Sequence, residues 1–376
     1  MINVVSPAFA KIVHFPVRNR VYKRTHRVQK GKDMMENGRN VTIYDIAREA
    51  GVSVATVSRV LTGNARVSKE KREKIESLIK KYDFKPNALA KSLRETKSRV
   101  IGMIMVDFTN PFYATLLSVC EREASSRGYS LIVSSTIGRA EMEEKYLDNM
   151  YEQRVAAIVK VGGLVDRFIP DMKHIEHMNR IANSIPIVIT GTADGADCYQ
   201  VKIDEMKACE LVMDYLLELG HKKIAIVGGS AEVRQTVEKR LKYKQILQRN
   251  GITFNEKFIV EGDYNDKSGY REMKKLLELG THPTAVIAIN DFTAIGIIRA
   301  AFEMGLRIPQ DISVVSFDDT FITKICHPRL TSVSLEYEEF GKKLVDTAID
   351  AIEGKEPMRK QMVLPRLIVR DSCRFL

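Results

Sequence analysis

Long apolar runs are missing from this sequence, and so is a convincing secretion signal. The longest apolar run spans residues 100–106, whereas a membrane-spanning helix needs about 18 apolar residues or more. Ala8-Phe9-Ala10 resembles a signal-peptidase site, but neither a positive stretch nor a true apolar segment precedes it. These absences exclude a membrane-spanning role, and we expect the protein in the cytoplasm.

Cysteine is scarce and scattered. The five cysteines are odd in number and never stand in a C-x-x-C pair, which argues against both a disulfide framework and a zinc cluster. We therefore expect no metal and no cofactor. The cysteines are interpreted as small buried hydrophobic residues: Cys120, Cys198, Cys209, Cys326 and Cys373.

Catalytic motifs are also missing. The sequence contains no G-x-G-x-x-G, no G-x-x-x-x-G-K-[ST], no H-E-x-x-H and no G-x-S-x-G, so the common nucleotide, zinc-protease and serine-hydrolase sites have no counterpart. Gly228-Gly229-Ser230 is interpreted as a loop after a strand. We expect a protein that is not an enzyme.

Positive charge is present in excess and is unevenly distributed. Residues 1–39 carry nine Lys/Arg and two Asp/Glu, and residues 40–99 carry fourteen and seven. The first 99 residues thus carry a net charge of +14 and the remaining residues one of −3, which together give the net charge of +11. A basic head on a mildly acidic body favours a polyanion as the partner of the head.

Residues 42–82 have the pattern of a helix-turn-helix, with apolar residues at helical spacing that predict three short helices. Between the first two, Gly51 permits the left-handed backbone of a tight turn and Ser53 is placed to cap the second helix. A plain three-helix bundle explains the periodicity equally well. The apolar faces are Ile46, Ala47 and Ala50; Val57, Val60 and Leu61; and Ile75, Leu78, Ile79 and Tyr82.

In a helix-turn-helix the second helix enters the major groove, where its outward side chains meet base edges. Those side chains are Val54, Ala55, Ser58 and Arg59. Arg59 suits a bidentate contact to guanine, whereas Val54 and Ala55 offer apolar contact to a thymine methyl group. Small polar groups of the kind that bind phosphate oxygens come from Thr42, Tyr44, Ser53, Thr56 and Asn64.

The segment after the third helix decides between the two interpretations. Residues 82–93 read YDFKPNALAKSL, a Pro-initiated helix too short to be stable alone. The TVSRVL helix, the Y-x-x-x-PNxxAxxL segment and the VIGMIMV strand that follows resemble the LacI family of transcriptional regulators in order and spacing. The resemblance covers roughly residues 41–372 and implies a DNA-binding regulator.

The same resemblance assigns a role to residues 86–98. It implies that the hinge helices of a dimer fold on operator DNA and push Leu93 between base pairs in the minor groove, with Ala88 and Lys91 beside it. An apolar wedge of this kind unstacks a base step and kinks the duplex. The sequence therefore predicts a hinge helix and linker at this position.

Beyond Arg99, apolar runs alternate with amphipathic helices, which is typical of parallel sheets. Helices are expected over residues 112–127, 204–219, 268–279 and 291–304, several closed by a glycine. We expect strands over residues 100–106, 131–134, 157–161, 185–190, 223–227, 285–290, 314–317 and 363–369.

The fold class expected from the resemblance is α/β: a body similar to periplasmic binding proteins, with two doubly wound parallel-sheet subdomains, and an all-α helix-turn-helix head. The domains are residues 1–39, a basic extension; 40–85, the head; 86–98, the hinge and linker; and 99–376, the body. Within the body, the N-terminal subdomain takes about 99–202 and 320–350, and the C-terminal subdomain about 203–319 and 355–372.

An effector is expected in the crevice at the strand carboxyl ends. Asp107 and Phe112 follow the first strand, Asn290 and Asp291 follow a later one, and the resemblance gives Asp291 the role of binding sugar hydroxyls. Asn290-Asp291 also suits a helix N-cap, and Asp318-Asp319 a turn.

Two departures from the family pattern concern the ligand. Lys239 stands where sugar binders usually have arginine, within Lys239-Arg240-Leu241-Lys242-Tyr243, and Gly191 stands where many members have a ligand-binding Asp. Clustered cations favour an anionic effector, such as a sugar acid or a sugar phosphate. The candidate effectors are therefore a neutral sugar, a sugar acid and a sugar phosphate.

The partners expected are operator DNA, a small sugar-derived effector and a second copy of the chain. A homodimer on a pseudo-palindrome is expected, because the C-terminal residues lack the leucine heptads of a tetramerising coil. We expect the effector to be an inducer that releases a repressor. The alternative is a catabolite-control regulator that uses a phosphorylated carrier protein as corepressor, although His327 replaces an arginine expected there.

Residues 1–39 match no part of the family. Either translation begins at Met34 or Met35, or these residues form a DNA-contacting arm.

Overall fold

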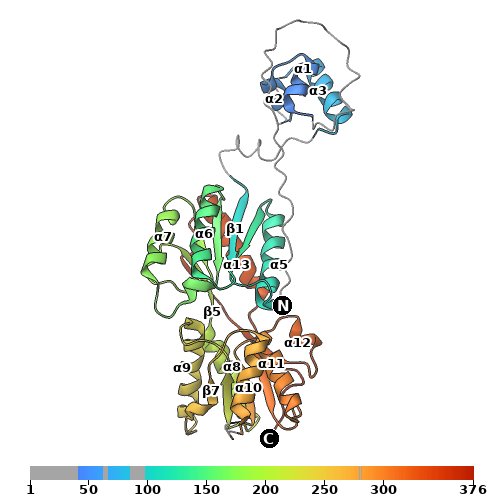
Figure 1. Ribbon diagram of the computed structural model, residues 1–376. Coiled ribbons are helices and arrows are strands. Elements are labelled where there is room, and N and C mark those ends of the chain that lie inside the picture. Colours follow the sequence, from blue (N-terminus) through green and yellow to red (C-terminus); the bar gives the residue numbers. More distant parts are fainter. Residues whose placement is uncertain (1–40, 62–66, 85–97, 279, 281) are drawn as a thin grey trace, which may run out of the picture. The chain divides into compact units, whose positions relative to one another are not determined.

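The computed structural model describes residues 41–61, 67–84, 98–278, 280 and 282–376. These residues form a small helical head and a larger α/β body, two compact units that we treat separately (Figure 1). The expected extension at residues 1–39 and the hinge helix at 86–97 lie outside the described residues.

The head contains the predicted helices α1 (Ile43–Ala50), α2 (Val54–Leu61) and α3 (Lys69–Lys81). A capping box starts α1, because the Thr42 side chain accepts from the Asp45 N–H while the Asp45 carboxylate accepts from the Thr42 N–H. Gly51 ends α1 with φ 69°, the left-handed turn predicted from its position. The three helices share one small core that includes Ile46, Val57 and Ile75.

The N-terminal subdomain of the body has a six-stranded parallel sheet in the order β11-β5-β4-β3-β1-β2. Helices cover both of its faces (Figure 1). Its elements are β1 (Val100–Met105), α5 (Pro111–Ser126), β2 (Ser130–Ser135), α6 (Ala140–Glu152), β3 (Ala157–Val161), the 3-10 helix η1 (Gly163–Asp166), α7 (Met172–Ala182), β4 (Ile187–Ile189), β5 (Tyr199–Ile203), α13 (Tyr337–Ile352) and β11 (Lys360–Val363).

The C-terminal subdomain repeats this plan in the order β12-β10-β9-β8-β6-β7, with β12 antiparallel. Its elements are α8 (Glu205–Glu218), β6 (Ile224–Val227), α9 (Arg234–Arg249), the 3-10 helix η2 (Glu256–Phe258), β7 (Ile259–Val260), α10 (Asp266–Glu278), β8 (Ala285–Ala288), α11 (Asp291–Glu303), β9 (Ser313–Asp318), α12 (Ile322–Ile325), β10 (Thr331–Ser334) and β12 (Arg366–Ile368). The expected fold class is confirmed.

Each sheet separates two hydrophobic cores. Successive residues of a strand point to opposite faces, so Met103 and Met105 of β1 pack in the core with α5 and α13, whereas Ile104 packs with α6 and α7. In the other subdomain α8 and α9 cover one face, and α10 and α11 the other. Both faces of the strands are therefore buried, and only the strand ends are left to form a site.

The chain crosses between the subdomains three times, after β5, after β10 and between β11 and β12. Residues 320–335 belong to the C-terminal subdomain, since β10 pairs with β9, and residues 360–363 to the N-terminal one, since β11 pairs with β5. Both findings correct the boundaries expected from the sequence. The predicted strand 363–369 is split because Pro365 has no N–H to continue a ladder.

Candidate DNA interface and effector crevice

Helix α2 has one face in the head core and one face outward. Val57 and Val60 are buried, whereas Ser53, Ala55 and Arg59 are exposed. The Ser53 hydroxyl accepts from the Thr56 N–H at 3.2 Å, which caps the helix as predicted. The exposed face therefore presents a small apolar group near the helix N-terminus and a guanidinium in the last turn, side chains of the kind that read base edges.

The remaining predicted DNA contacts are placed less uniformly. Thr42 and Tyr44 are exposed, and Thr56 and Ser58 are half-buried. Val54 is half-buried because it also packs against the head core, which leaves only part of its side chain for a base contact. Four predicted contacts lie outside the described residues: Asn64, Ala88, Lys91 and Leu93.

The crevice between the subdomains is marked by tyrosines and carboxylates that approach from both sides. Burial raises the pKa of Tyr113 well above its usual value, and the charges of Asp166 and Asp318 raise it further, with Tyr264 also nearby. Tyr113 and Asp166 belong to the N-terminal subdomain, and Tyr264 and Asp318 to the C-terminal one. All four keep part of their surface exposed, and they follow or end strands of the two subdomains at their carboxyl ends, the place where the crevice is expected.

The backbone is strained where β9 meets this crevice. Asp318 has φ 103° and Asp319 has φ 51°, both in the left-handed region that costs a residue other than glycine about 1–3 kcal/mol. Arg370 Nη2 donates to Asp319 Oδ1 at 2.6 Å, and Thr323 Oγ1 donates to the same atom at 3.0 Å. These contacts hold the turn that carries the Asp318 carboxylate toward the crevice.

Among the predicted effector residues, Asp107 and Phe112 are already engaged locally. Asp107 accepts from the N–H and the hydroxyl of Thr109, both at 2.8 Å. The Phe112 ring packs edge-on against Tyr113, with centroids 4.9 Å apart, and lies partly in the core. Asn290 caps α11 by accepting from the Thr293 N–H at 2.8 Å.

Asp291 is buried and its carboxylate accepts four hydrogen bonds from the protein. Oδ1 accepts from Ser316 at 2.5 Å and from Ser332 at 2.8 Å. Oδ2 accepts from the N–H and the hydroxyl of Thr320, at 2.6 and 2.9 Å. Burial nevertheless raises the pKa of Asp291 to about 6. In this conformation the carboxylate joins α11, β9 and β10, and its role toward an effector stays a prediction.

The clustered cations of α9 are paired with carboxylates from other elements. Buried Lys239 donates to Glu205 and lies over the Phe317 ring, Arg240 contacts Glu261 at 2.5 Å, and Lys242 contacts Glu210 at 3.2 Å. The pairing of Lys239 explains why its pKa is raised even though burial opposes the charged form. The reason for expecting an anionic effector therefore does not hold in the structure.

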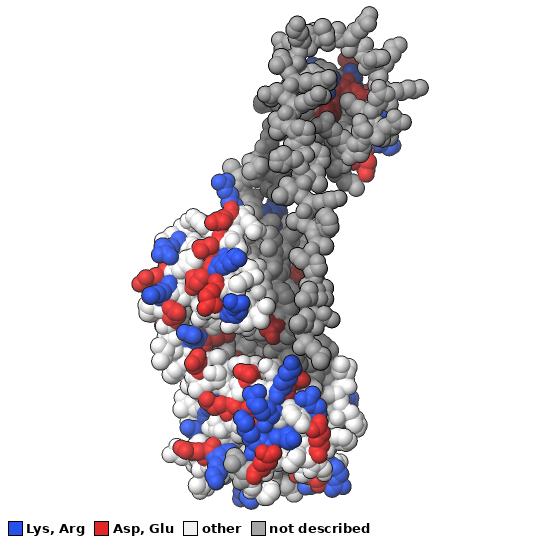
Figure 2. Space-filling model, in the orientation of Figure 1, with Lys and Arg blue, Asp and Glu red and all other residues white. Residues whose placement is uncertain are grey.

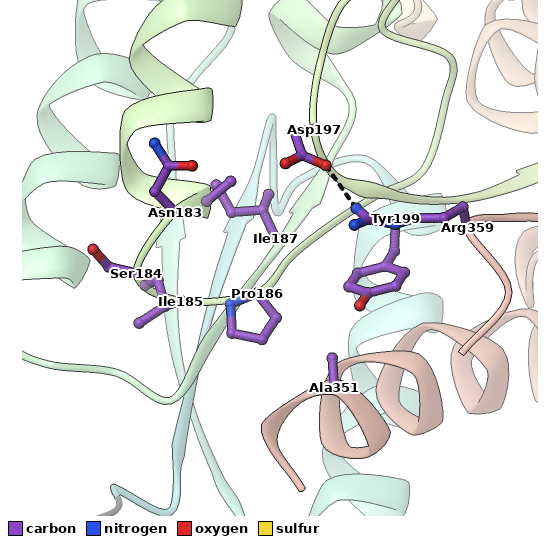
Figure 3. A pocket seen from close by; sticks show the side chains of 10 residues that line it. Asn183, Ser184, Ile185, Pro186, Ile187, Asp197, Tyr199, Ala351 and Arg359 are labelled. Carbon is purple, nitrogen blue, oxygen red and sulfur yellow. Dashed lines mark hydrogen bonds and ion pairs between the residues drawn. The ribbon is translucent and has the colours of Figure 1, made fainter. Parts of the chain in front are cut away.

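A pocket of about 170 Å³ lies elsewhere, at the amino ends of β4 and β5 (Figure 3). Arg359 is one of the lining residues; it contacts Asp197 at 2.8 Å and stacks on the Tyr199 ring. None of the predicted effector residues lines this pocket. Ligands of parallel sheets bind at the carboxyl ends, so we keep the crevice as the effector site.

The body surface carries both signs of charge, interspersed over the visible face (Figure 2). On α10 and α11 three basic groups have carboxylate partners: Arg271 and Lys275 pair with Glu272, and Arg299 with Asp266 at 3.8 Å. Within the described ranges no helix is long and apolar enough to cross a membrane. The part of the chain that the structure describes also contains no metal-binding group of His, Cys, Asp and Glu.

Comparisons with known proteins agree with this division into head and body. Residues 42–87 match the family model described as bacterial regulatory proteins, lacI family, and residues 213–373 match a periplasmic binding protein-like domain. Catabolite control protein A of Priestia megaterium is 36% identical over 304 residues, which is 80% of this chain and 90% of that protein. This chain belongs to the lacI family.

Solved structures of the family share the whole architecture. A lac repressor dimer bound to operator and the anti-inducer ONPF has a TM-score of 0.80 at 27% identity, covering 89% of this chain and 100% of that one. The regulator CelR in complex with cellobiose has a TM-score of 0.66 at 25% identity, covering 88% and 99%. As a lacI-family member, the protein is a DNA-binding transcriptional regulator.

Sequence reasoning missed several crevice residues of this regulator. Asp166 and Tyr113 belong to the N-terminal wall, and Tyr264 belongs to the C-terminal one. Asp166 ends the 3-10 turn that directly follows β3. The position at the carboxyl end of a predicted strand was the available signal for Asp166.

Proposed function

We propose that this regulator represses carbohydrate-utilisation genes, binds a pseudo-palindromic operator as a homodimer, and is released when a sugar-derived effector enters its crevice. One observation carries the proposal: a head with an outward recognition face is joined to a body in which tyrosines and carboxylates of two subdomains approach one another. Such a chain has a site for DNA and a separate site for a small molecule.

On the DNA side, α2 enters the major groove. Arg59 contacts a guanine, Ala55 and the free part of Val54 contact a thymine methyl group, and Ser58 lies beside them. Phosphate contacts fix the register of the head; they come from Thr42, Tyr44, Ser53, Thr56 and Asn64. Ala88, Lys91 and Leu93 act at the minor groove in the centre of the operator.

On the effector side, the ligand lies between the subdomains, near the predicted residues Asp107, Phe112, Lys239, Asn290 and Asp291. Of these, Lys239 is already paired with Glu205. The lac repressor relative is a dimer that binds operator and an anti-inducer, and the CelR relative binds cellobiose. An effector changes DNA affinity only if it binds the two conformations of the body with different affinity. We assign it the role of inducer.

The relatives are regulators, and we propose accordingly that this chain acts without catalysis, in the cytoplasm, where its DNA lies. In the test, full-length protein is used to select binding sites from random DNA duplexes, and sugars are then added to the selected complex. The proposal expects enrichment of a two-fold symmetric site and release by at least one sugar. No enriched sequence contradicts it.

A second function is favoured by the relative named catabolite control protein A. In this alternative a phosphorylated carrier protein is the corepressor, and the exposed side chains Phe321 and Ile325, at the edge of the body, offer it an apolar surface. Selected operator DNA that no sugar releases, but that a phosphorylated carrier protein binds more tightly to the regulator, would establish this function instead.

A further inference from the structure

Helices α6 and α7 pack side by side in the N-terminal subdomain (Figure 1), and four titratable side chains meet between them. Glu144 Oε1 contacts His174 Nδ1, and Glu144 Oε2 contacts His177 Nδ1. The other ring nitrogen of His177, Nε2, lies 2.8 Å from Asp148 Oδ1. We call Glu144, Asp148, His174 and His177 the histidine cluster. None of the four belongs to the predicted DNA contacts or effector contacts.

The surroundings of His177 require both of its ring nitrogens to donate. An ionised carboxylate only accepts hydrogen bonds, and only the imidazolium form of histidine carries a proton on each nitrogen. Each nitrogen of His177 faces a carboxylate, Glu144 on one side and Asp148 on the other. Burial opposes the charged form, but these two hydrogen bonds outweigh it and raise the pKa of His177 above its usual value. The side chain is 14% exposed, so its proton can exchange with water.

His174 is held in the neutral form. Its Nδ1 donates to Glu144, whereas Nε2 is buried and has no hydrogen-bond partner within the described residues. Glu143 Oε2 lies 4.0 Å from this nitrogen, beyond hydrogen-bond distance. Burial and the charge of Lys160 lower the pKa of His174. The two histidines therefore share one carboxylate but have pKa values shifted in opposite directions.

Two neighbouring residues of α6 hold the two ends of the segment that runs from η1 to the first turn of α7. At one end, Glu143 accepts from the Leu164 N–H at 3.1 Å and is paired with Lys160. At the other end, Glu144 binds His174 in the first turn of α7. The first anchor contains no histidine, whereas the second belongs to the histidine cluster.

Between these two anchors, the chain reaches the opposite subdomain. Arg167 forms a bridge with Val233, and the Phe168 N–H donates to the Glu232 carbonyl at 2.7 Å. The segment is short, so a change in how firmly α7 is held reaches these contacts within a few residues. The protonation of the histidine cluster is thus linked to a contact between the subdomains.

We propose that the histidine cluster is a pH-sensitive switch. When His177 releases its proton to water, Glu144 loses a charged partner, α7 loosens from α6, and residues 167–171 hold the opposite subdomain less firmly. The switch lies outside the head and the expected effector contacts, so it can fail while the proposed function stands.

The groups around the two rings come from few elements. Strand β4, which also packs against α7, carries no titratable side chain. On α7 itself, Lys173 and Glu176 are adjacent to the histidines in the sequence. The charged groups that face the rings from α6 and β3 are Glu143, Glu144, Asp148 and Lys160.

The direction of the effect follows from linkage between protonation and folding. The pKa of His177 is higher in the folded protein than its ordinary value of 6.5. The contribution of its contacts to stability is therefore complete below pH 6.5 and is lost as the pH rises through the raised pKa. The lowered pKa of His174 acts in the opposite sense, so its contribution is lost as the pH falls below 6.5. The switch is closed between the two pKa values and opens on the alkaline side.

NMR of the full chain, labelled with 13C in its histidine rings, measures the titration itself. His177 should titrate above pH 6.5 and His174 below it, with the signals assigned from His177→Gln and His174→Gln. Asp148→Asn removes one of the two carboxylates that face His177 and should lower the pKa of this ring.

Amide hydrogen exchange of the full chain measures the opening. Between pH 6.5 and pH 9 the protection of α7 and residues 167–171, corrected for the intrinsic pH dependence of exchange, should fall about two- to fivefold, the size expected for a partly exposed charge pair. In His177→Gln the protection should be low at both pH values. His282→Gln removes an exposed histidine of the C-terminal subdomain and should behave like wild type.

Three results would overturn the proposal, and two of them need no variant. The first is titration of His177 at or below pH 6.5, and the second is equal protection of α7 in wild type at both pH values. The third is a rise in Tm on addition of Zn²⁺ that His177→Gln abolishes, because the cluster would then hold a metal ion instead of a proton.

Discussion

Arg234 and Asp194 join the two subdomains across the crevice. Arg234 Nη2, at the start of α9, lies 3.0 Å from Asp194 Oδ2, in the loop between β4 and β5. The Arg234 guanidinium also lies over the Phe168 ring, and the Phe168 N–H donates to the Glu232 carbonyl at 2.7 Å. We call these contacts the clasp. It holds the subdomains together in addition to the three chain crossings.

Removal of the clasp should loosen the crevice locally without unfolding the body. We expect Arg234→Ala to speed amide hydrogen exchange at Phe168, because its N–H bond to Glu232 then opens more often. The change in Tm should be small, since an exposed ion pair contributes about 0.2–1 kcal/mol. Arg249→Ala, which removes a pair to Asp214 within one subdomain, is the control. Unchanged exchange at Phe168 would show that the Arg234 side chain does not help to hold the subdomains together.

Asp166 gives the body a specific dependence of stability on pH. Its pKa is raised from 3.8 to about 7 in the folded protein, so between these values the folded state keeps a proton that the unfolded chain has lost. Its contribution to stability is therefore full below about pH 4 and is lost as the pH rises through 7. The advantage of Asp166→Asn over wild type should grow between pH 5 and pH 8.

Thermal denaturation at the two pH values measures this effect. A gain of at least about 2 °C in the Tm difference is expected, the shift for 1 kcal/mol in a domain of roughly this size. Asp197→Asn controls for the loss of a carboxylate at the surface. A Tm difference that stays constant from pH 5 to pH 8 would mean that Asp166 is ionised throughout.

Removal of one charge from the buried pair of Lys160 and Glu143 should lower the unfolding free energy more than removal of both charges. Both side chains are almost fully buried, and Glu143 also accepts from the Leu164 N–H at 3.1 Å. Lys160→Met leaves a buried carboxylate unpaired and should cost about 3–5 kcal/mol of unfolding free energy in urea. Lys160→Met combined with Glu143→Gln keeps an acceptor for Leu164 and should recover most of the loss. Equal losses in the single and the double variant would contradict this account.

The cap of α2 can be separated from a phosphate contact of the same residue. Ser53→Ala removes the acceptor of the Thr56 N–H and should destabilise the head by about 1 kcal/mol. Ser53→Asn keeps a cap of similar strength, so it should restore helix stability in circular dichroism. If Ser53 also binds phosphate through its small hydroxyl, operator affinity should stay reduced in Ser53→Asn. Full recovery of affinity would assign Ser53 to capping alone.

The sequence predicts the parts of this fold that depend on local signals. The βαβ alternation, the glycine turn at Gly51 and the cap at Ser53 are encoded within a few residues, and the structure shows each of them. The strand expected over 363–369 is different. Its apolar residues continue past Pro365, but the chain there leaves one sheet for the other. Periodicity reports burial, and does not report which sheet buries a residue.

The crevice depends on partners far apart in the sequence, and this explains what was misjudged there. The cations from Lys239 to Lys242 form a cluster in the sequence, but their carboxylates come from α8 and from the segment after β7. Asp166 becomes a crevice residue because position 191, 25 residues later, is glycine. Pairings of this kind appear only when the strands are side by side.

The most direct test of the central claim is the affinity of full-length protein for its selected operator, compared with a duplex of the same composition but scrambled half-sites. We predict that wild type binds the operator at least about 1,000-fold more tightly than the scrambled duplex. Arg59→Ala should lose about 10- to 100-fold on the operator and little on the scrambled duplex. Equal affinity of wild type for both duplexes would contradict sequence-specific regulation by this protein.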